Sequence, residues 1–182
     1  MRLLHIMDSD DYEGCTRLAV RHSARALIVS DGKIAMIHSL ENDFYKFPGG
    51  GIEQGESKEN ALIRETLEET GLHIIPDSIE EFGYIHRILR SLIYEDECFI
   101  QNNYYYFCKV TDEISVPKYT GSELAEKFVP EFVDPRIAYE KNSRVIKDDG
   151  MVYRENIVLK LLIEKMDTEQ ALPRHAGQGD LK

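Results

Sequence analysis

The feature that most constrains the fold is a glycine-rich loop that leads into an acidic helix. Residues 47–51 read FPGGG, and three adjacent glycines lose much conformational freedom when a chain folds. Residues 57–70 are mostly good helix formers, with Ser57 placed as an N-cap and Gly71 placed as a left-handed C-cap. The sequence therefore predicts a loop whose backbone closely approaches another group, followed by a helix with defined ends.

The predicted helix carries its acids on one face. Glu65, Glu68 and Glu69 follow the spacing i, i+3 and i+4, which brings side chains together on a helix. Like charges so spaced cost ~0.2–0.5 kcal/mol per pair, and the negative end of the helix dipole adds to the cost. On its own such a pattern is typical of a solvated helix face. The glycine loop in front favours a site instead, because free backbone groups there can face a metal or a phosphate.

The same stretch resembles the Nudix box, the signature of the MutT-like Nudix hydrolases. The box reads Gly, five residues, Glu, seven residues, Arg-Glu, an apolar residue, any residue, Glu-Glu, any residue, Gly and an apolar residue. The positions that match it are Gly50, Glu56, Arg64, Glu65, Glu68, Glu69, Gly71 and Leu72. Thr66 stands where the family usually has an aliphatic residue, and its β-branched side chain is close to valine in size.

The resemblance implies a fold of the α/β (α+β) class, with a mixed β-sheet sandwiched between α-helices. It covers about residues 18–166, so that residues 1–17 are expected to form an N-terminal arm and residues 167–182 a mobile C-terminal tail. Asp31-Gly32 predicts a tight hairpin, whereas residues 111–127 are expected to be loop. The strands expected from composition and alternation lie at residues 23–30, 33–39, 81–92, 99–110 and 128–133.

The resemblance also implies an enzyme that hydrolyses a nucleoside diphosphate linked to another moiety, with Mg²⁺ or Mn²⁺ as cofactor. The implied metal ligands are the carboxylates of Glu56, Glu65, Glu68 and Glu69 and the carbonyl of Gly49. Arg64 would orient the carboxylates through charge-assisted hydrogen bonds. The general base stays open between Glu65, Glu68 and an acid of the following loop, for which Glu123 and Glu126 are the candidates.

The substrate is less constrained than the reaction. The proline that marks many ADP-ribose enzymes is missing after the box, and the coenzyme A and NADH signatures are absent as well. A nucleoside triphosphate, canonical or oxidised, is therefore the first expectation, with release of pyrophosphate. ADP-ribose or a nucleotide sugar is the alternative. A non-catalytic nucleotide-sensing or protein-binding module is the alternative of another class, and a homodimer is left open.

Composition narrows the partners. A net charge of −11 argues against duplex nucleic acid and anionic membranes as partners, and the resemblance implies a small nucleotide as substrate. Three cysteines without metal-ligand spacing, a start without a sustained apolar run and the lack of ~18 consecutive apolar residues lead us to expect a cytoplasmic protein. Arg21 and Arg25, around the first expected strand, are interpreted as surface charges rather than phosphate ligands.

Overall fold

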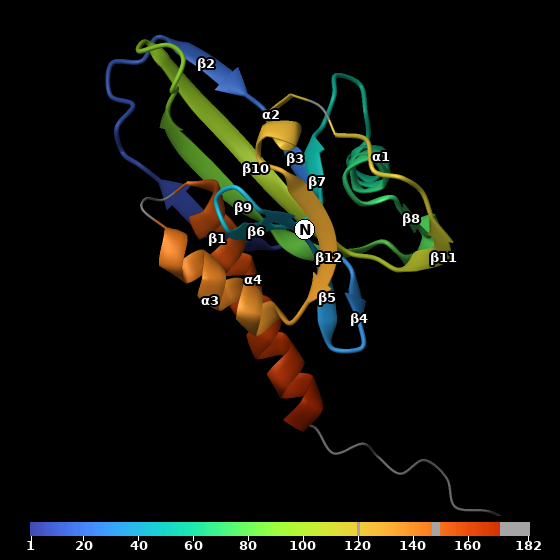
Figure 1. Ribbon diagram of the computed structural model, residues 1–182. Coiled ribbons are helices and arrows are strands. Elements are labelled where there is room, and N and C mark those ends of the chain that lie inside the picture. Colours follow the sequence, from blue (N-terminus) through green and yellow to red (C-terminus); the bar gives the residue numbers. More distant parts are fainter. Residues whose placement is uncertain (120, 147–149, 172–182) are drawn as a thin grey trace, which may run out of the picture.

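A computed structural model describes residues 1–119, 121–146 and 150–171. The strands are β1 (Leu3–Asp8), β2 (Arg17–Val20), β3 (Ser23–Leu27), β4 (Val29–Ser30), β5 (Lys33–Ser39), β6 (Phe44–Lys46), β7 (Gly49–Gly51), β8 (Leu72–Ile74), β9 (Glu80–Arg90), β10 (Glu97–Phe107), β11 (Val110–Ile114) and β12 (Phe128–Val133) (Figure 1). The helices are α1 (Lys58–Thr70), α2 (Gly121–Ala125), α3 (Pro135–Val145) and α4 (Met151–Ala171), with a 3₁₀ turn at Pro76–Ser78. Within the part of the chain so described, no helix has the length and apolar character needed to cross a membrane.

The strands form three sheets. The largest has the order β1-β9-β10-β3-β7, with β2 paired to β10. It is a mixed sheet, because β10 runs antiparallel to β9 and parallel to β3. A four-stranded sheet has the order β12-β5-β4 with β6 on β5, and β8 pairs with β11. The α/β (α+β) class with a mixed sheet, expected from the sequence, is confirmed.

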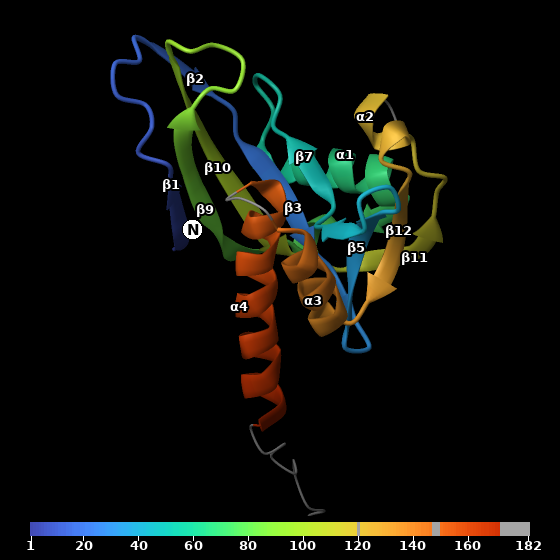
Figure 2. The same ribbon diagram turned by 60° about the vertical axis from the view of Figure 1, so that its left-hand side comes forward.

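Helices cover both faces of the large sheet (Figure 2). Side chains alternate along a strand, so Tyr105 and Tyr106 of β10 point to opposite faces. Tyr105, fully buried, belongs to the core that includes Val158 and Leu159 of α4. Tyr106 belongs to the core on the other face, with Leu62 of α1. The sheet is thus sandwiched between α1 and α4, as the resemblance implies.

The predicted ends of α1 are confirmed. The hydroxyl of Ser57 accepts a hydrogen bond from the backbone N–H of Asn60 at 3.1 Å. Gly71 has φ of 74°, in the left-handed region, and its N–H bonds the carbonyl of Leu67 at 2.9 Å. A Cβ on Gly71 would lie 1.8 Å from the carbonyl oxygen of Ser115. The absence of a side chain at Gly71 therefore also lets the segment around Ser115 approach the end of α1.

The expected hairpin is confirmed as well. Asp31 and Gly32 have φ of 50° and 75°, and Ser30 pairs with Lys33 across the turn. Two consecutive positive φ angles are typical of the tight turns that suit twisted antiparallel strands. The expected strand at 23–30 is divided into β3 and β4, because the chain leaves the large sheet after Leu27 and joins the four-stranded sheet.

The region between β10 and β12 differs from the sequence expectation. Residues 111–127 were expected to be loop, but β11 and the short helix α2 occupy parts of them. β11 is a strand because Val110 and Ile114 pair with Ile74 and Leu72 of β8. The side chains of residues 111–114 are exposed, so the segment lacks the apolar alternation by which a strand is recognised in a sequence.

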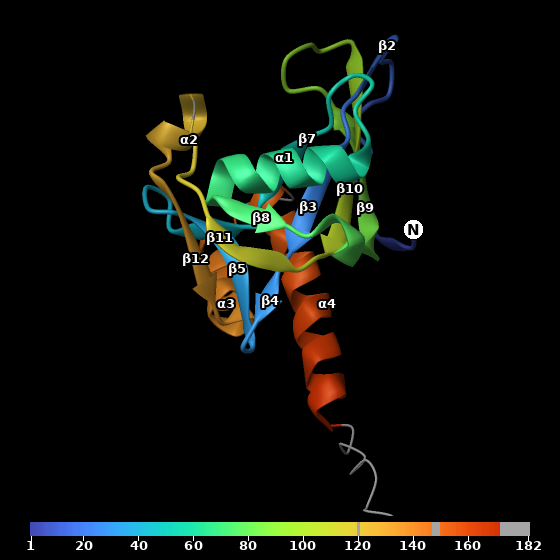
Figure 3. The same ribbon diagram turned by 90° about the vertical axis from the view of Figure 1, so that its right-hand side faces the viewer.

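The chain ends also differ. β1 lies in the N-terminal arm expected at residues 1–17, yet it pairs in parallel with β9 and forms one edge of the large sheet. Met7 is its buried residue, with 4% of its surface exposed, and it belongs to the core under α4. The expected tail at residues 167–182 is helical as far as Ala171, which extends α4 away from the sheet (Figure 3). The rest of the tail lies outside the described residues.

Candidate active site

The glycine loop is held close to two neighbouring segments. β7 pairs with β3, and Gly49 lies opposite Arg25. A Cβ on Gly49, where φ is 127°, would lie 2.1 Å from the carbonyl oxygen of Ala24. A Cβ on Gly50 would lie 2.2 Å from Oε2 of Glu65. The first glycine therefore permits the sheet pairing, and the second leaves room for a carboxylate of α1.

Arg64 connects the loop with the acids of the helix. Its Nε and Nη2 donate to the two carboxylate oxygens of Glu56, both at 2.9 Å. Nη1 donates to Oε1 of Glu65 at 2.7 Å, and Nη2 also donates to the carbonyl of Gly51 at 3.1 Å. The hydrogen bond from Arg64 lowers the pKa of Glu56 from 4.5 to about 2. These contacts fit the orienting role that the resemblance implies for Arg64.

Glu69 lies in a different environment from the other box glutamates. Only 3% of its surface is exposed, its Oε1 accepts a hydrogen bond from the ammonium of Lys46, and its Oε2 accepts the N–H of Gly49 at 2.9 Å. Burial raises the pKa of Glu69, and the nearby charges of Lys46 and Arg25 oppose that rise. Glu69 thus ties α1 to the beginning of the glycine loop.

A cavity of about 580 Å³ opens above the loop and is lined by charges of both signs. The acids that line it are Glu65, Glu68 and Glu69, the cations are Arg21, Arg25, Lys46 and Lys118, and the remaining lining residues are Ser23, Gln101 and residues 49–51. The loop and α1 supply the acids and glycines. Arg21 and Arg25 lie just before and within β3, and Lys118 lies in the segment before α2.

Most of these cations were not expected from the sequence. Arg25 was interpreted as a surface charge, which is wrong, because it is 8% exposed and donates to the carbonyls of Phe47, at 3.2 Å, and Gly49. Arg21 packs over Gly51 and also lines the cavity. Lys46 directly precedes the glycine loop, and this position in the sequence could have indicated that it lies at the site. No local sequence feature indicated Lys118, because tertiary contacts bring its segment to α1, where its N–H bonds the carbonyl of Glu68 at 2.7 Å.

The loop acids proposed as general bases are placed elsewhere or not described. The carboxylate of Glu126 accepts hydrogen bonds from the hydroxyl of Ser39 at 2.6 Å and the amide of Asn42 at 2.8 Å. It is not among the described residues that line the cavity. Glu123 lies in α2, and its side chain is outside the described part of the structure. Of the other two candidates, both Glu65 and Glu68 line the cavity.

A buried polar network supports the loop from behind. The Oε2 of Glu155, on α4, accepts the N–H of Phe47 at 3.0 Å. Its Oε1 accepts from Nε and Nη2 of Arg154, at 3.1 and 2.6 Å. Arg154 also donates to Oδ1 of Asn103 at 2.7 Å, and the hydroxyl of Ser23 donates to the same oxygen at 2.7 Å. The loop is therefore fixed to α4 through groups that are almost fully buried.

The carboxylate oxygens at the cavity are suitable ligands for a divalent cation. Glu65 and Glu68 have side chains that are 18% and 48% exposed, so their hard carboxylate oxygens are accessible. The space that Gly50 leaves beside Glu65 keeps that carboxylate at the cavity wall. Among the described residues no three acidic, histidine or cysteine side chains form a ready metal cluster. Arg64 forms ion pairs with Glu56 and Glu65, and Lys46 forms one with Glu69.

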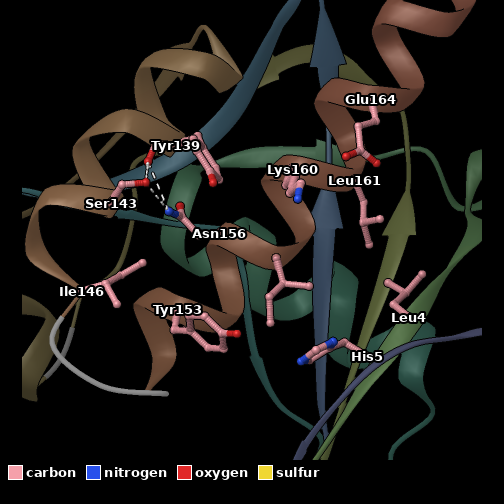
Figure 4. Close-up of a pocket in the computed structure, with 11 residues that line it drawn as sticks. Leu4, His5, Tyr139, Ser143, Ile146, Tyr153, Asn156, Lys160, Leu161 and Glu164 are labelled. Carbon is pink, nitrogen blue, oxygen red and sulfur yellow. Dashed lines mark hydrogen bonds between the residues drawn. The ribbon is translucent and has the colours of Figure 1, made fainter.

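A second cavity, of about 590 Å³, lies between β1, α3 and α4 (Figure 4). Tyr139, Ser143 and Asn156 form hydrogen bonds with one another along one wall. Glu164 is the acidic side chain among its described lining residues. One carboxylate is a poor metal site, so the chemistry expected from the sequence belongs to the glutamate cavity.

Comparison with known proteins agrees with this placement. The sequence model of the NUDIX domain matches residues 20–148. The chain is 37% identical over 76 residues to the RNA pyrophosphohydrolase of Sphingopyxis alaskensis, covering 37% of this chain and 48% of that protein. It is 45% identical over 49 residues to the ADP-ribose pyrophosphatase of Methanocaldococcus jannaschii, covering 25% of this chain and 29% of that protein. The chain thus spans about half or less of the length of these relatives.

Solved structures extend the likeness to most of the chain. A NUDIX hydrolase from Nitrosomonas europaea superposes with a TM-score of 0.57 at 17% identity, covering 89% of this chain and 98% of that one. The E. coli ORF135 protein gives a TM-score of 0.54 at 18% identity, covering 86% and 96%. At this identity the superpositions show the fold alone. Because the family's sequence model covers well over half of the chain and the fold agrees, the protein belongs to the Nudix hydrolase family.

Proposed function

We propose that the chain is a pyrophosphohydrolase that depends on Mg²⁺ or Mn²⁺ and cleaves a phosphoanhydride bond in a nucleotide. The observation that carries the proposal is the cavity above residues 49–51, in which carboxylates of α1 face the cations Arg21, Arg25 and Lys118. Carboxylates suit a hard divalent cation, and fixed cations suit the phosphates that such a cation also binds. A purely structural acidic helix face would not require cations that line the same cavity.

Each side chain has a role in this proposal. Glu65 and Glu68 would hold the cation, and Arg64 keeps Glu65 and Glu56 in position. When bound, the cation neutralises charge on the diphosphate. Glu68 or Glu65 accepts the proton of the attacking water. Arg21 and Lys118, which line the cavity from other segments, meet the phosphate oxygens and orient the scissile bond.

The first candidate substrate is a nucleoside triphosphate, canonical or oxidised, which would be split to the monophosphate and pyrophosphate. ADP-ribose is the second, supported by the 45% identity to the ADP-ribose pyrophosphatase of M. jannaschii. The match to an RNA pyrophosphohydrolase adds the 5′-triphosphate end of RNA as a third. All three substrates contain two or more linked phosphates, so the charges of the cavity suit each of them. The groups beyond the phosphates therefore determine which substrate is preferred.

A non-catalytic nucleotide-binding module is the alternative of another class. The complete box in the sequence, with Glu65, Glu68 and Glu69 lining the cavity, disfavours it, because a sensor needs no metal-polarised water. We further propose a cytoplasmic location, supported by the free thiols of Cys15, Cys98 and Cys108, since secreted proteins usually pair their cysteines.

The test is chromatographic detection of the hydrolysis products from a panel of nucleotides with Mg²⁺ and with Mn²⁺, because triphosphates release phosphate or pyrophosphate whereas the diphosphate-linked compounds give two monophosphates. The panel contains canonical and oxidised deoxynucleoside triphosphates, ADP-ribose, NADH, a nucleotide sugar and a short 5′-triphosphate RNA. We expect metal-dependent turnover that is strongest for one of these classes and is lost with EDTA. Nucleotide binding without turnover of any of them would contradict the proposal and favour the non-catalytic module.

A further inference from the structure

The C-terminal end of α1 is bound by a segment that lies far away in the sequence. Residues 115–119, the capping segment, follow β11 and pass the last turn of α1 (Figure 3). The N–H of Lys118 donates to the backbone carbonyl of Glu68 at 2.7 Å. The hydroxyl of Tyr119 donates to the backbone carbonyl of Glu69 at 2.9 Å. The capping segment thus satisfies carbonyls that a helix leaves without partners at its C-terminal end.

The first residue of the capping segment is also held by hydrogen bonds. The N–H of Ser115 donates to the carbonyl of Gly71 at 2.8 Å, and its hydroxyl forms a hydrogen bond with Nε2 of His73 at 2.8 Å. The apolar side chains on either side of Ser115 are not buried, since Ile114 is 73% exposed and Val116 is 83% exposed. The position of the capping segment therefore depends on a few hydrogen bonds, and the loss of one of them should be felt.

The capping segment also brings a positive charge to the acidic end of α1. Glu68 and Glu69 lie in the last turn, near the negative end of the helix dipole, and that turn contains no basic residue. Lys118 supplies a cation from outside the helix. Its exposed side chain lines the catalytic cavity together with Glu65 and Glu68. An ammonium at this place is accessible to a phosphate group that enters the cavity.

We propose that Tyr119 is a positioning residue, whose hydroxyl fixes the capping segment to α1 so that the ammonium of Lys118 stays at the cavity and binds a phosphate of the substrate. Tyr119 is not among the described residues that line the cavity, so it acts through its neighbour. Without the bond to the carbonyl of Glu69, the backbone of Lys118 can move away from α1. Substrate binding then weakens, whereas the carboxylates of α1 keep their places. The inference rests on the proposed function, because it concerns how the substrate of that reaction is bound.

The experiment is a double-mutant cycle in the full-length chain, with kcat and KM measured for Tyr119→Phe, Lys118→Met and the two substitutions together on the best substrate of the panel. Lys118→Met removes the charged contact to phosphate, so we expect KM to rise about tenfold with kcat changed by less than about twofold. Tyr119→Phe deletes one hydroxyl, and we expect KM to rise about three- to fivefold. In the Lys118→Met background the loss of the hydroxyl should change KM by less than about 1.5-fold, because the group that it positions is gone.

Two control variants separate this role from a general effect on the structure. Lys118→Arg keeps the positive charge, so its KM should stay within about threefold of the wild-type value. Tyr153→Phe deletes a tyrosine hydroxyl at the second cavity and should leave KM unchanged. Circular dichroism checks that all variants are folded.

An equal effect of Tyr119→Phe in the presence and in the absence of Lys118 would overturn the inference and leave the proposed function standing, because the hydroxyl would then act through α1 itself. A Tyr119→Phe variant with the KM of the wild type would overturn it as well. A wild-type chain that hydrolyses no member of the panel would instead overturn the proposed function, and the inference with it.

Discussion

Arg64 binds Glu56 through two parallel hydrogen bonds, from Nε to Oε1 and from Nη2 to Oε2, each 2.9 Å long. The same guanidinium reaches Glu65 and the carbonyl of Gly51. One side chain of α1 thus fixes both the end of the glycine loop and the turn that precedes the helix. Only the planar fork of an arginine can make these contacts together, so a lysine could not replace it.

This pair predicts a pH dependence of stability. The pKa of Glu56 is about 2 in the folded protein, compared with an ordinary value of 4.5. Because the folded-state pKa is the lower one, the contribution of Glu56 to stability is fully present above about pH 4.5 and is lost as the pH falls towards 2.

The measurement is the free energy of unfolding in urea between pH 7 and pH 2, for the wild type and for Glu56→Gln. We expect the variant to be less stable at pH 7 and the difference to shrink below pH 4.5. Glu53→Gln, at an exposed acid of the same turn, is the control and should leave the pH profile unchanged. A constant difference across the range would mean that Glu56 is not held by its charge.

Removing the charge of Glu68 should abolish most of the activity without unfolding the protein. The side chain is 48% exposed, so Glu68→Gln should change the free energy of unfolding by less than about 0.5 kcal/mol. The loss of one metal ligand should lower kcat/KM by about two to three powers of ten. Steady-state kinetics on the best substrate of the panel check this, with Glu59→Gln on the first turn of α1 as the matched control. Full activity of Glu68→Gln would refute its place in the site.

Adjacent glycines of the loop should respond differently to a methyl group. In Gly50→Ala the new Cβ meets the end of the flexible Glu65 side chain, at 2.2 Å, so the carboxylate can move aside. We expect a folded protein with kcat/KM lowered by about 10²-fold, because a catalytic group is displaced. Circular dichroism and kinetics measure the two effects separately.

Gly49→Ala is the counterpart. Its Cβ would meet the backbone oxygen of Ala24 at 2.1 Å, and its φ of 127° is a strained value for alanine. We expect a loss of stability of about 1–3 kcal/mol or more, seen as a lower midpoint of urea unfolding. Two glycine variants that were equally stable would contradict this separation of structural and catalytic roles.

Glu155 should be a structural residue although it carries a charge. It is fully buried, and it binds Arg154 and the N–H of Phe47. Glu155→Gln leaves the guanidinium of Arg154 buried without its ion pair, so we expect a loss of about 3–5 kcal/mol in the free energy of unfolding. Glu164→Gln, on the exposed face of the same helix, should be neutral. A small effect at Glu155 would show that the loop does not depend on α4.

The sequence by itself determined the parts of the protein that depend on neighbours in the chain. The ends of α1 are local, because Ser57 and Gly71 cap the helix through hydrogen bonds spanning three or four residues. The Asp31-Gly32 hairpin is local for the same reason. The common face of Glu65 and Glu68 follows from the helical period, and the resemblance to the Nudix box added the sandwich fold.

The tertiary structure alone decided which charges meet in the cavity and where the sheet ends. Lys118 reaches α1 because its segment bonds the carbonyl of Glu68, and β1 joins the domain because it pairs with β9, far away in the sequence. Glu68 and Glu69 look equivalent in the sequence. Their surroundings differ because Lys46, which projects from strand β6, is buried beside Glu69 and not beside Glu68. Such pairings depend on contacts between distant segments, which local spacing cannot encode.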